Sequence, residues 1–222
     1  MREIMDIIKL NHIALIYVLN CITINTFADT FLEGGLGLGK IGHTYTSDFG
    51  AYVSNVSIQP ALQLGLIHKI SISEKHTIGV GIAFMNINGK LNSGINGENY
   101  PRIEEYKVTE QRIYLSLPLS YHLPMKSFEL AGKLSPAFWL SKQLNGSGTI
   151  TDRTTGETTP YSWTGTKKNS LLASFFSLEL AKSMGDKLGI ALELQQEFLA
   201  PKGALGKRWS AKQALLKVRY QL

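Results

Sequence analysis

Residues 111–141 alternate in polarity over a long run, and this pattern constrains the fold more than any other feature. Apolar side chains take every second position of the first half, namely Ile113, Leu115, Leu117, Leu119, Tyr121 and Leu123. The positions between them carry Arg112, Tyr114, Ser116, Pro118, Ser120 and His122. A period of two predicts a β-strand with one apolar face. Strands of soluble proteins are usually about five or six residues long, whereas a tilted membrane-barrel strand needs about nine to eleven, so this run has the length of a membrane strand.

A turn at residues 124–127 joins this strand to a second one of the same kind. Its apolar row is Phe128, Leu130, Leu134, Phe138 and Leu140, opposed by Glu129, Ala131, Lys133, Ser135, Ala137 and Ser141. If the apolar rows face lipid, the charged side chains point into a lumen, where buried charges require paired partners. The hairpin alone fits a soluble sandwich equally well, with its apolar rows in the core and its charges in water.

Composition narrows the fold class. The chain has 222 residues, of which 44% are hydrophobic and 18% charged, so it is one medium domain with a real core and is not wholly disordered. Its 21 glycines and 9 tyrosines, against 7 prolines, favour an all-β protein with many turns. The net charge of +6 is not gathered into a basic stripe, which argues against nucleic acid as a partner.

Residues 1–28 have the pattern of a removable signal peptide. Arg2 and Lys9 lie early, residues 13–19 form a short apolar run, and Ala28 supplies a small residue at the cut. The mature domain would therefore span residues 29–222 and belong to an exported protein. Cys21 is the only cysteine of the chain, so the mature part would contain neither a disulfide nor a cysteine metal site.

Period-two patterning predicts eight strands in the mature chain. They cover residues 30–41, 56–70, 78–85, 111–123, 128–141, 170–183, 187–198 and 213–222. Residues 34–40 have the glycine spacing of a phosphate-binding loop, but Ile41 stands where a Ser or Thr must reach magnesium. Because the alternation continues through these glycines, we interpret them as small residues that line a narrow barrel.

The connections between these strands differ in length in a regular way. Those after the second, fourth and sixth strands are short, whereas residues 86–105 and 142–169 form long connections on the other side. The first of these holds the turn dipeptides Asn88-Gly89 and Asn96-Gly97, and in the second, residues 149–153 and 158–163 could pair as a strand extension. Short turns on one side and long loops on the other are typical of outer-membrane barrels. We therefore predict an all-β fold, an eight-stranded antiparallel up-and-down transmembrane β-barrel.

This organisation, with a last strand ending Val218, Arg219, Tyr220, Gln221 and Leu222, resembles the small outer-membrane β-barrel family, including the porin-like barrels common in Bacteroidetes. The run from Tyr114 to Tyr121, with Pro118 among leucines, is similar to the strand before an inner turn in that family. The last residue of the family is usually Phe, and Leu222 departs from this. The resemblance implies an integral protein of the bacterial outer membrane, often without catalytic activity, whose C-terminal strand is read by the barrel assembly machinery and whose wall contacts membrane lipid.

The polar faces of the predicted strands share a set of charged residues of both signs: Glu33, Arg112, Glu129, Lys133, Glu193, Glu197, Lys217 and Arg219. They could line a conduction path or form a salt-bridged plug. An eight-stranded barrel is only just wide enough to hold its own side chains, which favours the plug. We expect Glu193 and Glu197 to pair with Lys133, Lys217 or Arg219.

The sequence offers little chemistry. Five histidines are scattered without a ligand spacing, so we expect no metal site, no cofactor and no enzymatic activity, and no Ser, His and carboxylate stand together at a readable spacing. The favoured hypothesis is a structural or surface-interaction protein with an extracellular partner at residues 86–105 and 142–169. The alternatives are a lipid-modifying barrel enzyme and a soluble, lipocalin-like binder of an apolar ligand.

Overall fold

The structure is a computed structural model that describes residues 28–43, 55–73, 75–95, 101–167, 172–199 and 209–222. The regular elements in these ranges are all strands: β1 (Ala28–His43), β2 (Asn55–Ser57), β3 (Gln59–Ser73), β4 (His76–Ile95), β5 (Arg102–Ser116), β6 (Leu119–Pro124), β7 (Glu129–Asp152), β8 (Thr158–Lys167), β9 (Leu172–Ser183), β10 (Leu188–Leu199) and β11 (Trp209–Gln221). No helix that is long and apolar enough to cross a membrane occurs among these residues.

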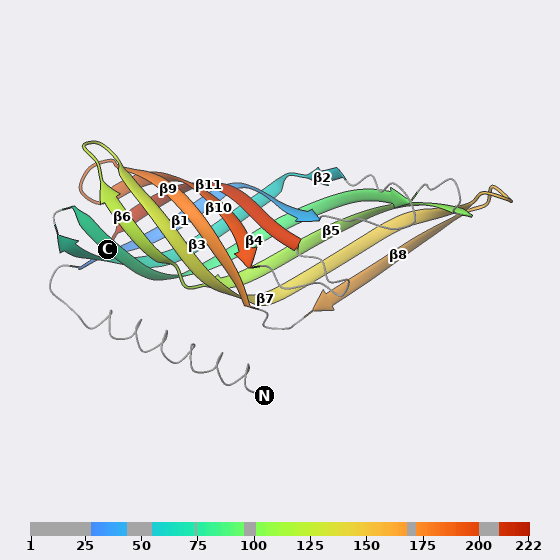
Figure 1. Cartoon of the computed structure of the whole chain (residues 1–222), viewed down its shortest axis with the longest axis horizontal. Coiled ribbons are helices and arrows are strands. Elements are labelled where there is room, and N and C mark those ends of the chain that lie inside the picture. Colours follow the sequence, from blue (N-terminus) through green and yellow to red (C-terminus); the bar gives the residue numbers. More distant parts are fainter. Residues whose placement is uncertain (1–27, 44–54, 74, 96–100, 168–171, 200–208) are drawn as a thin grey trace, which may run out of the picture.

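The strands form a closed antiparallel barrel, drawn in Figure 1. Pairing runs from β1 through β3, β4, β5 with β6, β7, β9 and β10 to β11, and β11 pairs with β1 to close the ring. Three of the eleven elements continue another one: β2 precedes β3 along β4, β6 follows β5, and β8 precedes β9 along β7. The ring therefore has eight strands, and the predicted all-β, eight-stranded antiparallel barrel is confirmed.

The break between β5 and β6 has a simple cause. Pro118 has no backbone N–H to give to the ladder, so regular pairing stops there. The neighbouring strands still satisfy the remaining groups, because Gly81 N donates to Pro118 O at 3.0 Å and Leu117 N donates to Pro136 O at 2.8 Å. The wall stays closed across the interruption.

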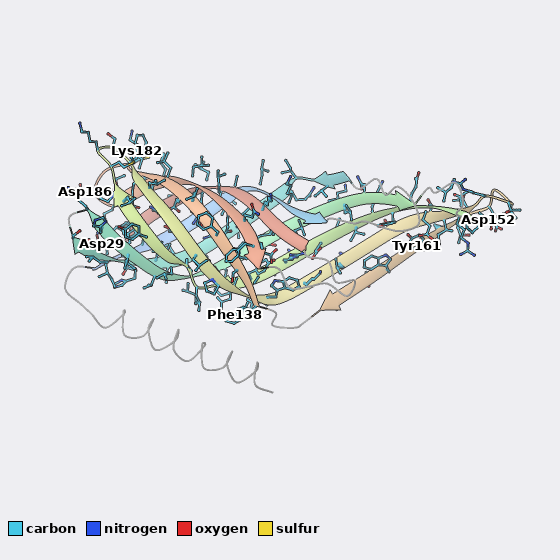
Figure 2. The ribbon with its side chains drawn as sticks, viewed as in Figure 1. Asp29, Phe138, Asp152, Tyr161, Lys182 and Asp186 are labelled. Atoms are coloured by element: carbon cyan, nitrogen blue, oxygen red, sulfur yellow. The ribbon has the colours of Figure 1, made fainter. Side chains whose placement is uncertain are left out.

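Side chains alternate across the wall as the sequence pattern predicts. Outward leucines are exposed, with Leu36 at 67% and Leu192 at 51%, whereas inward Ala191 and Leu215 are buried at 2% and 0%. Outward apolar residues recur on most strands of the barrel and form a continuous exposed belt, visible as outward sticks in Figure 2. Soluble monomers rarely expose apolar patches of this extent, so the belt is the surface that lipid would cover.

The two ends of the barrel differ. Short turns join Ser73 to His76, Pro124 to Glu129 and Ser183 to Leu188, and both β1 and β11 also begin or end there, so this end is called the short-turn end. At the opposite, loop end, β4, β5, β7 and β8 continue past the other strands as a projecting sheet (Figure 1). The predicted sorting of short connections to one end is therefore present in the structure.

The prediction that residues 86–105 form a long loop was wrong for most of that range. β4 continues to Ile95, β5 begins at Arg102, and the Asn88-Gly89 dipeptide lies inside the ladder with Gly89 opposite Glu110. The dipeptide does not turn the chain because β5 supplies continuous hydrogen-bond partners along β4. Residues 96–100, with the second dipeptide, lie outside the described residues.

The range 142–169 was also more regular than a loop. The suggested pairing of residues 149–153 with 158–163 is present as Thr151 opposite Thr158 and Thr149 opposite Pro160, and it extends down to Lys142 opposite Lys167. A tight turn closes this hairpin, where the backbone N–H groups of Thr155 and Thr154 donate to Asp152 Oδ1 and lower the pKa of that carboxyl. The projecting sheet thus consists of paired strands with a short tip.

A β-bulge in β7 changes one predicted face. Tyr114 pairs with Trp139 and the next residue back, Ile113, pairs with Ser141, so Leu140 has no partner of its own. The extra residue reverses the alternation beyond it. Ser141, which the pattern placed on the inward face, therefore shares the outward face with Ile113, and Lys142 turns inward.

Two further predictions concern the start of the chain. The glycine-rich residues 34–40 lie in β1, and residues 34–39 pair with strands on both sides, which agrees with their interpretation as part of a barrel wall. The signal-peptide pattern falls almost entirely on residues 1–27, which lie outside the described residues, so it stays a prediction.

Candidate functional site: a filled lumen

The inward faces of the strands carry the charged residues that the sequence predicted. Seven of the eight are buried, namely Glu33, Arg112, Lys133, Glu193, Glu197, Lys217 and Arg219. The eighth, Glu129, begins β7 at the short-turn mouth and has a side chain 26% exposed. The structure brings these residues together in two clusters at different heights, and an aromatic layer adjoins the upper one.

The lower cluster, called the charged layer, consists of six buried side chains in the half of the lumen nearer the short turns. They are Glu33 of β1, Lys133 of β7, Glu179 of β9, Glu193 of β10, and Lys217 and Arg219 of β11. Three are acids and three are bases, so the layer is neutral when all are ionised. A buried charge is tolerable only when it is paired and hydrogen-bonded, and this composition meets that condition.

Lysines join the acids of the charged layer. Lys217 Nζ forms ion pairs with Glu193, with Glu33 Oε2 at 3.2 Å and with Glu179 Oε2 at 3.6 Å. Lys133 Nζ lies 2.5 Å from Glu179 Oε2 and 3.8 Å from Glu193 Oε2. Each lysine thus contacts acids from more than one strand, and the expected pairing of Glu193 with Lys133 and Lys217 is present.

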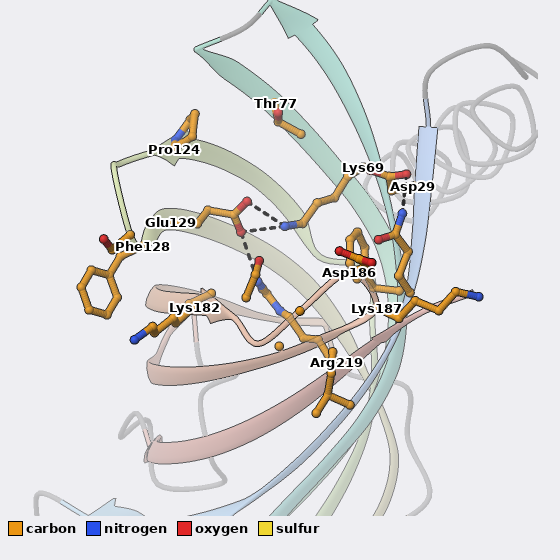
Figure 3. Close-up of a pocket in the computed structure, with 18 of the residues that line it drawn as sticks. Asp29, Lys69, Thr77, Pro124, Phe128, Glu129, Lys182, Asp186, Lys187 and Arg219 are labelled. Carbon is orange, nitrogen blue, oxygen red and sulfur yellow. Dashed lines mark hydrogen bonds and ion pairs between the residues drawn. The ribbon is translucent and has the colours of Figure 1, made fainter.

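Arg219 links the charged layer to the mouth at the short-turn end. Its Nε lies 2.6 Å from Glu33 Oε1, its Nη2 contacts Glu179, and its Nη1 donates to Glu129 Oε1 at 3.1 Å. Glu129 also accepts from Lys69 Nζ at 2.6 and 2.9 Å. Figure 3 shows these two cations on either side of the Glu129 carboxylate, within a mouth of about 650 Å³. The mouth ends at an ion-paired floor.

A Ser–His–Glu series lies beside this floor, which corrects the expectation that no such cluster exists. His122 Nε2 lies 2.7 Å from Ser120 Oγ, and His122 Nδ1 lies 2.9 Å from Glu129 Oε1. Sequence reasoning missed it because the acid comes from the next strand, across the turn. Ser120 and His122 are 3% and 0% exposed, and a Cβ built on Gly79 would overlap both of them. Substrate has no room to reach the serine.

An aromatic layer fills the lumen above the charged layer. Tyr114 is fully buried and meets Phe175 and Trp139 edge-on, with ring centroids 5.1 and 6.1 Å apart. Small and aliphatic residues complete the layer: Ile41, Met85, Ile87, Ala137, Ala173 and Ala211. Phe175 is a large apolar residue on the inward face of β9, opposite the outward Phe176 and Leu178.

A second ion cluster lies against the aromatic layer and extends from it toward the loop end. Arg112 donates from Nε to Glu110 Oε1 at 2.6 Å and from Nη1 to Glu197 Oε2 at 3.1 Å, and its guanidinium lies over the Trp139 ring. Lys142, turned inward by the bulge, lies 2.8 Å from Glu110 Oε1. The expectation that Glu197 pairs with a base of the charged layer was therefore wrong. Arg112 takes that place because Glu197 lies opposite Phe175 in the β9–β10 register, at the level of the aromatic layer, where Arg112 and the Tyr114 hydroxyl both reach it.

Four charged residues of the lumen were not predicted: Lys69, Glu110, Lys142 and Glu179. Lys69 and Glu179 were readable, since both continue the inward row of their strands by steps of two. Glu110 lies one residue before the predicted strand and continues its inward row. Lys142 was not readable, because its inward direction depends on the bulge. Among the described residues, no three His, Cys, Asp or Glu side chains are placed to hold a metal ion.

The whole arrangement seals the described lumen by packing and pairing. Arg112, Tyr114, Phe175 and Lys217 are all less than 2% exposed, so the side chains of both ion clusters and of the aromatic layer exclude water. An apolar calyx of the lipocalin kind would need apolar walls around free space, whereas here charged side chains occupy that space. The lipocalin-like alternative does not fit.

Comparisons with known proteins give only distant likenesses in structure. No protein-family model and no curated protein sequence matches the chain. Among solved structures it is similar to Neisserial surface protein A (TM-score 0.46, 6% identity, 89% of this chain and 100% of that chain). It is also similar to Ail of Yersinia pestis in complex with the heparin analogue sucrose octasulfate (0.44, 10%, 89% and 100%) and to OprG of Pseudomonas aeruginosa (0.41, 12%, 88% and 96%). Likenesses at this level carry no argument about what the present chain binds.

Proposed function

We propose that this chain is an integral outer-membrane β-barrel protein with a sealed lumen, which acts in surface interaction through its projecting sheet. Export with removal of residues 1–28, insertion by the barrel assembly machinery through β11 and contact with membrane lipid are parts of the same proposal. The exposed apolar belt supports membrane insertion, because burying it in lipid removes a large apolar surface from water.

One observation carries the surface role. The barrel wall at β10 is 12 residues long, whereas β7 runs for 24 and β4 for 20. The additional length of β7 projects beyond the loop end, together with β5 and β8 (Figure 1). A barrel that only fills its own lumen has no need of these strands, so the projecting sheet is the part available to a partner.

The projecting sheet has two unlike faces. The face that continues the lumen carries Tyr106, Tyr161 and Trp163, with Trp163 41% exposed and packed over Gly146. The opposite face is rich in Ser and Thr, including Ser147 and Thr149. Exposed aromatic residues are enriched where proteins meet partners, which favours the aromatic face as the contact surface.

We propose no catalytic activity for this chain. Ser120 supports this, because its hydroxyl is buried and lies within hydrogen-bond distance of the Gly79 carbonyl oxygen at 3.2 Å as well as of His122. A nucleophile must reach substrate and face oxyanion donors. The buried Ser120 and His122, with the partly exposed Glu129, instead tie β6 to β7 and to the floor of the mouth.

Single cysteines test the topology of this proposal directly, because Cys21 is the only cysteine of the whole chain. Thr154→Cys places a thiol at the exposed tip of the projecting sheet, and Ser127→Cys places one in a short turn at the other end. A membrane-impermeant maleimide added to intact cells is expected to label the first variant and to spare the second. Both should react after lysis.

Reversed labelling, or labelling of both variants on intact cells, would contradict the orientation. Recovery of the protein in the soluble periplasmic fraction after carbonate extraction would remove the membrane assignment itself. The surface role then has its own test: replacing residues 145–163 with a short turn should keep the barrel inserted and abolish binding to any captured partner.

A further inference from the structure

An apolar hollow of about 520 Å³ lies on the outer wall of the barrel, across β1, β11, β10 and β9. Its centre is Ala214, whose cross-strand neighbours are Leu38 on β1 and Leu194 on β10. A single methyl group between two leucines leaves a depression in the wall. Phe176 and Leu178 of β9 also line the hollow, so it is continuous with the exposed belt.

Two lysines border the hollow on its loop-end side. Lys40 and Lys212 are direct cross-strand partners, both are exposed, and both line the hollow. Side chains in such a pair start from Cβ atoms about 4.5 to 5.5 Å apart, and like charges placed there destabilise the ladder. Among the described residues, neither ammonium forms an ion pair with a carboxylate. The pair therefore attracts an anion.

The position of the lysines along the strands says where that anion would lie. Toward the short-turn end the outward row continues as Leu38 and Leu36 on β1, and toward the loop end it continues as Gly42. Gln196, opposite Lys212 on β10, adds an amide donor at the same height. On β1 and β11 the lysines thus end the outward apolar row, close to the level at which lipid headgroups meet the hydrocarbon.

We propose that this hollow binds one phosphate-bearing membrane lipid, with an acyl chain over Ala214 and the phosphate between Lys40 and Lys212. The inference rests on the proposed membrane location. Lipid is favoured over free phosphate because most of the lining is apolar and gives a free ion nothing to bind, whereas it extends the contact of an acyl chain. The lysine stems pack along the same surface while their ammonium groups reach the phosphate.

The probe is phosphatidic acid, compared with phosphatidylcholine of the same acyl chains, each added to the full-length mature protein in an uncharged detergent. Native mass spectrometry counts the bound lipids and gives their Kd. The wild type should retain one phosphatidic acid more tightly than phosphatidylcholine. Lys40→Gln with Lys212→Gln should weaken phosphatidic acid binding about 25-fold, from about fivefold for each lysine near an anionic lipid.

Two further variants make the result specific. Lys182→Gln with Lys187→Gln removes the same charge from the exposed rim at the short-turn end and should change the Kd less than about twofold. Ala214→Leu fills the hollow without changing charge and should weaken phosphatidic acid several-fold. Millimolar inorganic phosphate should not displace the lipid, and displacement would indicate a simple phosphate site.

Flotation with phosphatidylcholine vesicles keeps the two proposals separable. If the wild type does not insert and float, the membrane proposal fails and this inference fails with it. If every variant inserts, but phosphatidic acid binds no better than phosphatidylcholine or the Lys40 and Lys212 double variant behaves like the control, the lipid site alone is overturned.

Discussion

The charged layer and the aromatic layer fill the same lumen by different physical means. In the charged layer, Lys217 and Arg219 of β11 contact acids that come from β1, β9 and β10. In the aromatic layer, Tyr114 and Phe175 fill space by edge-on contact. Ion pairs depend on each partner being present, whereas packed rings depend on total volume. The stability of the barrel should therefore depend more on which charge is removed from the charged layer than on which methyl group is removed from the aromatic layer.

The largest effect is expected in the charged layer. Glu193→Gln leaves Lys133 and Lys217 with one acid fewer, and an uncompensated buried charge costs about 3 to 5 kcal/mol of unfolding free energy. Urea unfolding in detergent or vesicles measures the loss. Adding Lys217→Met to Glu193→Gln restores charge balance and should recover part of it. Absence of recovery would mean that the layer stabilises by shape and not by charge.

A somewhat smaller loss is expected in the aromatic layer. Phe175→Ala removes a buried ring and leaves a cavity beside Tyr114, which should cost about 3 kcal/mol. Unlike the charged layer, this loss should not be recovered by any single second change of charge. Phe175→Leu is the matched control, since it keeps most of the volume and should cost less than about 1.5 kcal/mol by the same unfolding assay.

The smallest effect concerns Ser120. Ser120→Ala removes a hydroxyl hydrogen-bonded near the floor of the mouth, and one such bond contributes about 1 kcal/mol. The purified wild type is expected to show no esterase activity on short-chain ester substrates. Hydrolysis that disappears in Ser120→Ala and in His122→Ala would show that the series is catalytic. It would contradict the claim that substrate cannot reach the buried Ser120.

Much of the fold could be predicted because the side of a strand to which a side chain points follows from its position in the alternating sequence. Leu188, Ile190 and Leu192 against Ala191 and Glu193 give the two faces of β10 directly. The ends of the strands could not be predicted in this way. Asn88-Gly89 has the composition of a turn, yet both residues pair with β5. A local sequence pattern does not show which other segment of the chain will pair with it.

The site was predictable to the same degree. Period two was enough to place Glu33, Lys133 and Lys217 in the lumen, because each stands opposite an apolar row. The partners were not predictable, since pairing depends on strand register and height: Glu197 meets Arg112 beside the aromatic layer instead of a base of the charged layer. The inward direction of Lys142 depends on the bulge in β7, which the sequence pattern does not predict.

Single-channel recording of the wild-type protein in planar bilayers tests the central claim, that the lumen is closed by its own side chains. The account predicts insertion without steady conductance, and no gain of conductance in Glu193→Gln beyond that caused by unfolding. Large, steady, charge-selective currents, shifted in selectivity by Glu193→Gln while the melting temperature stays unchanged, would contradict it, because hydrated charges in an open pore behave in that way.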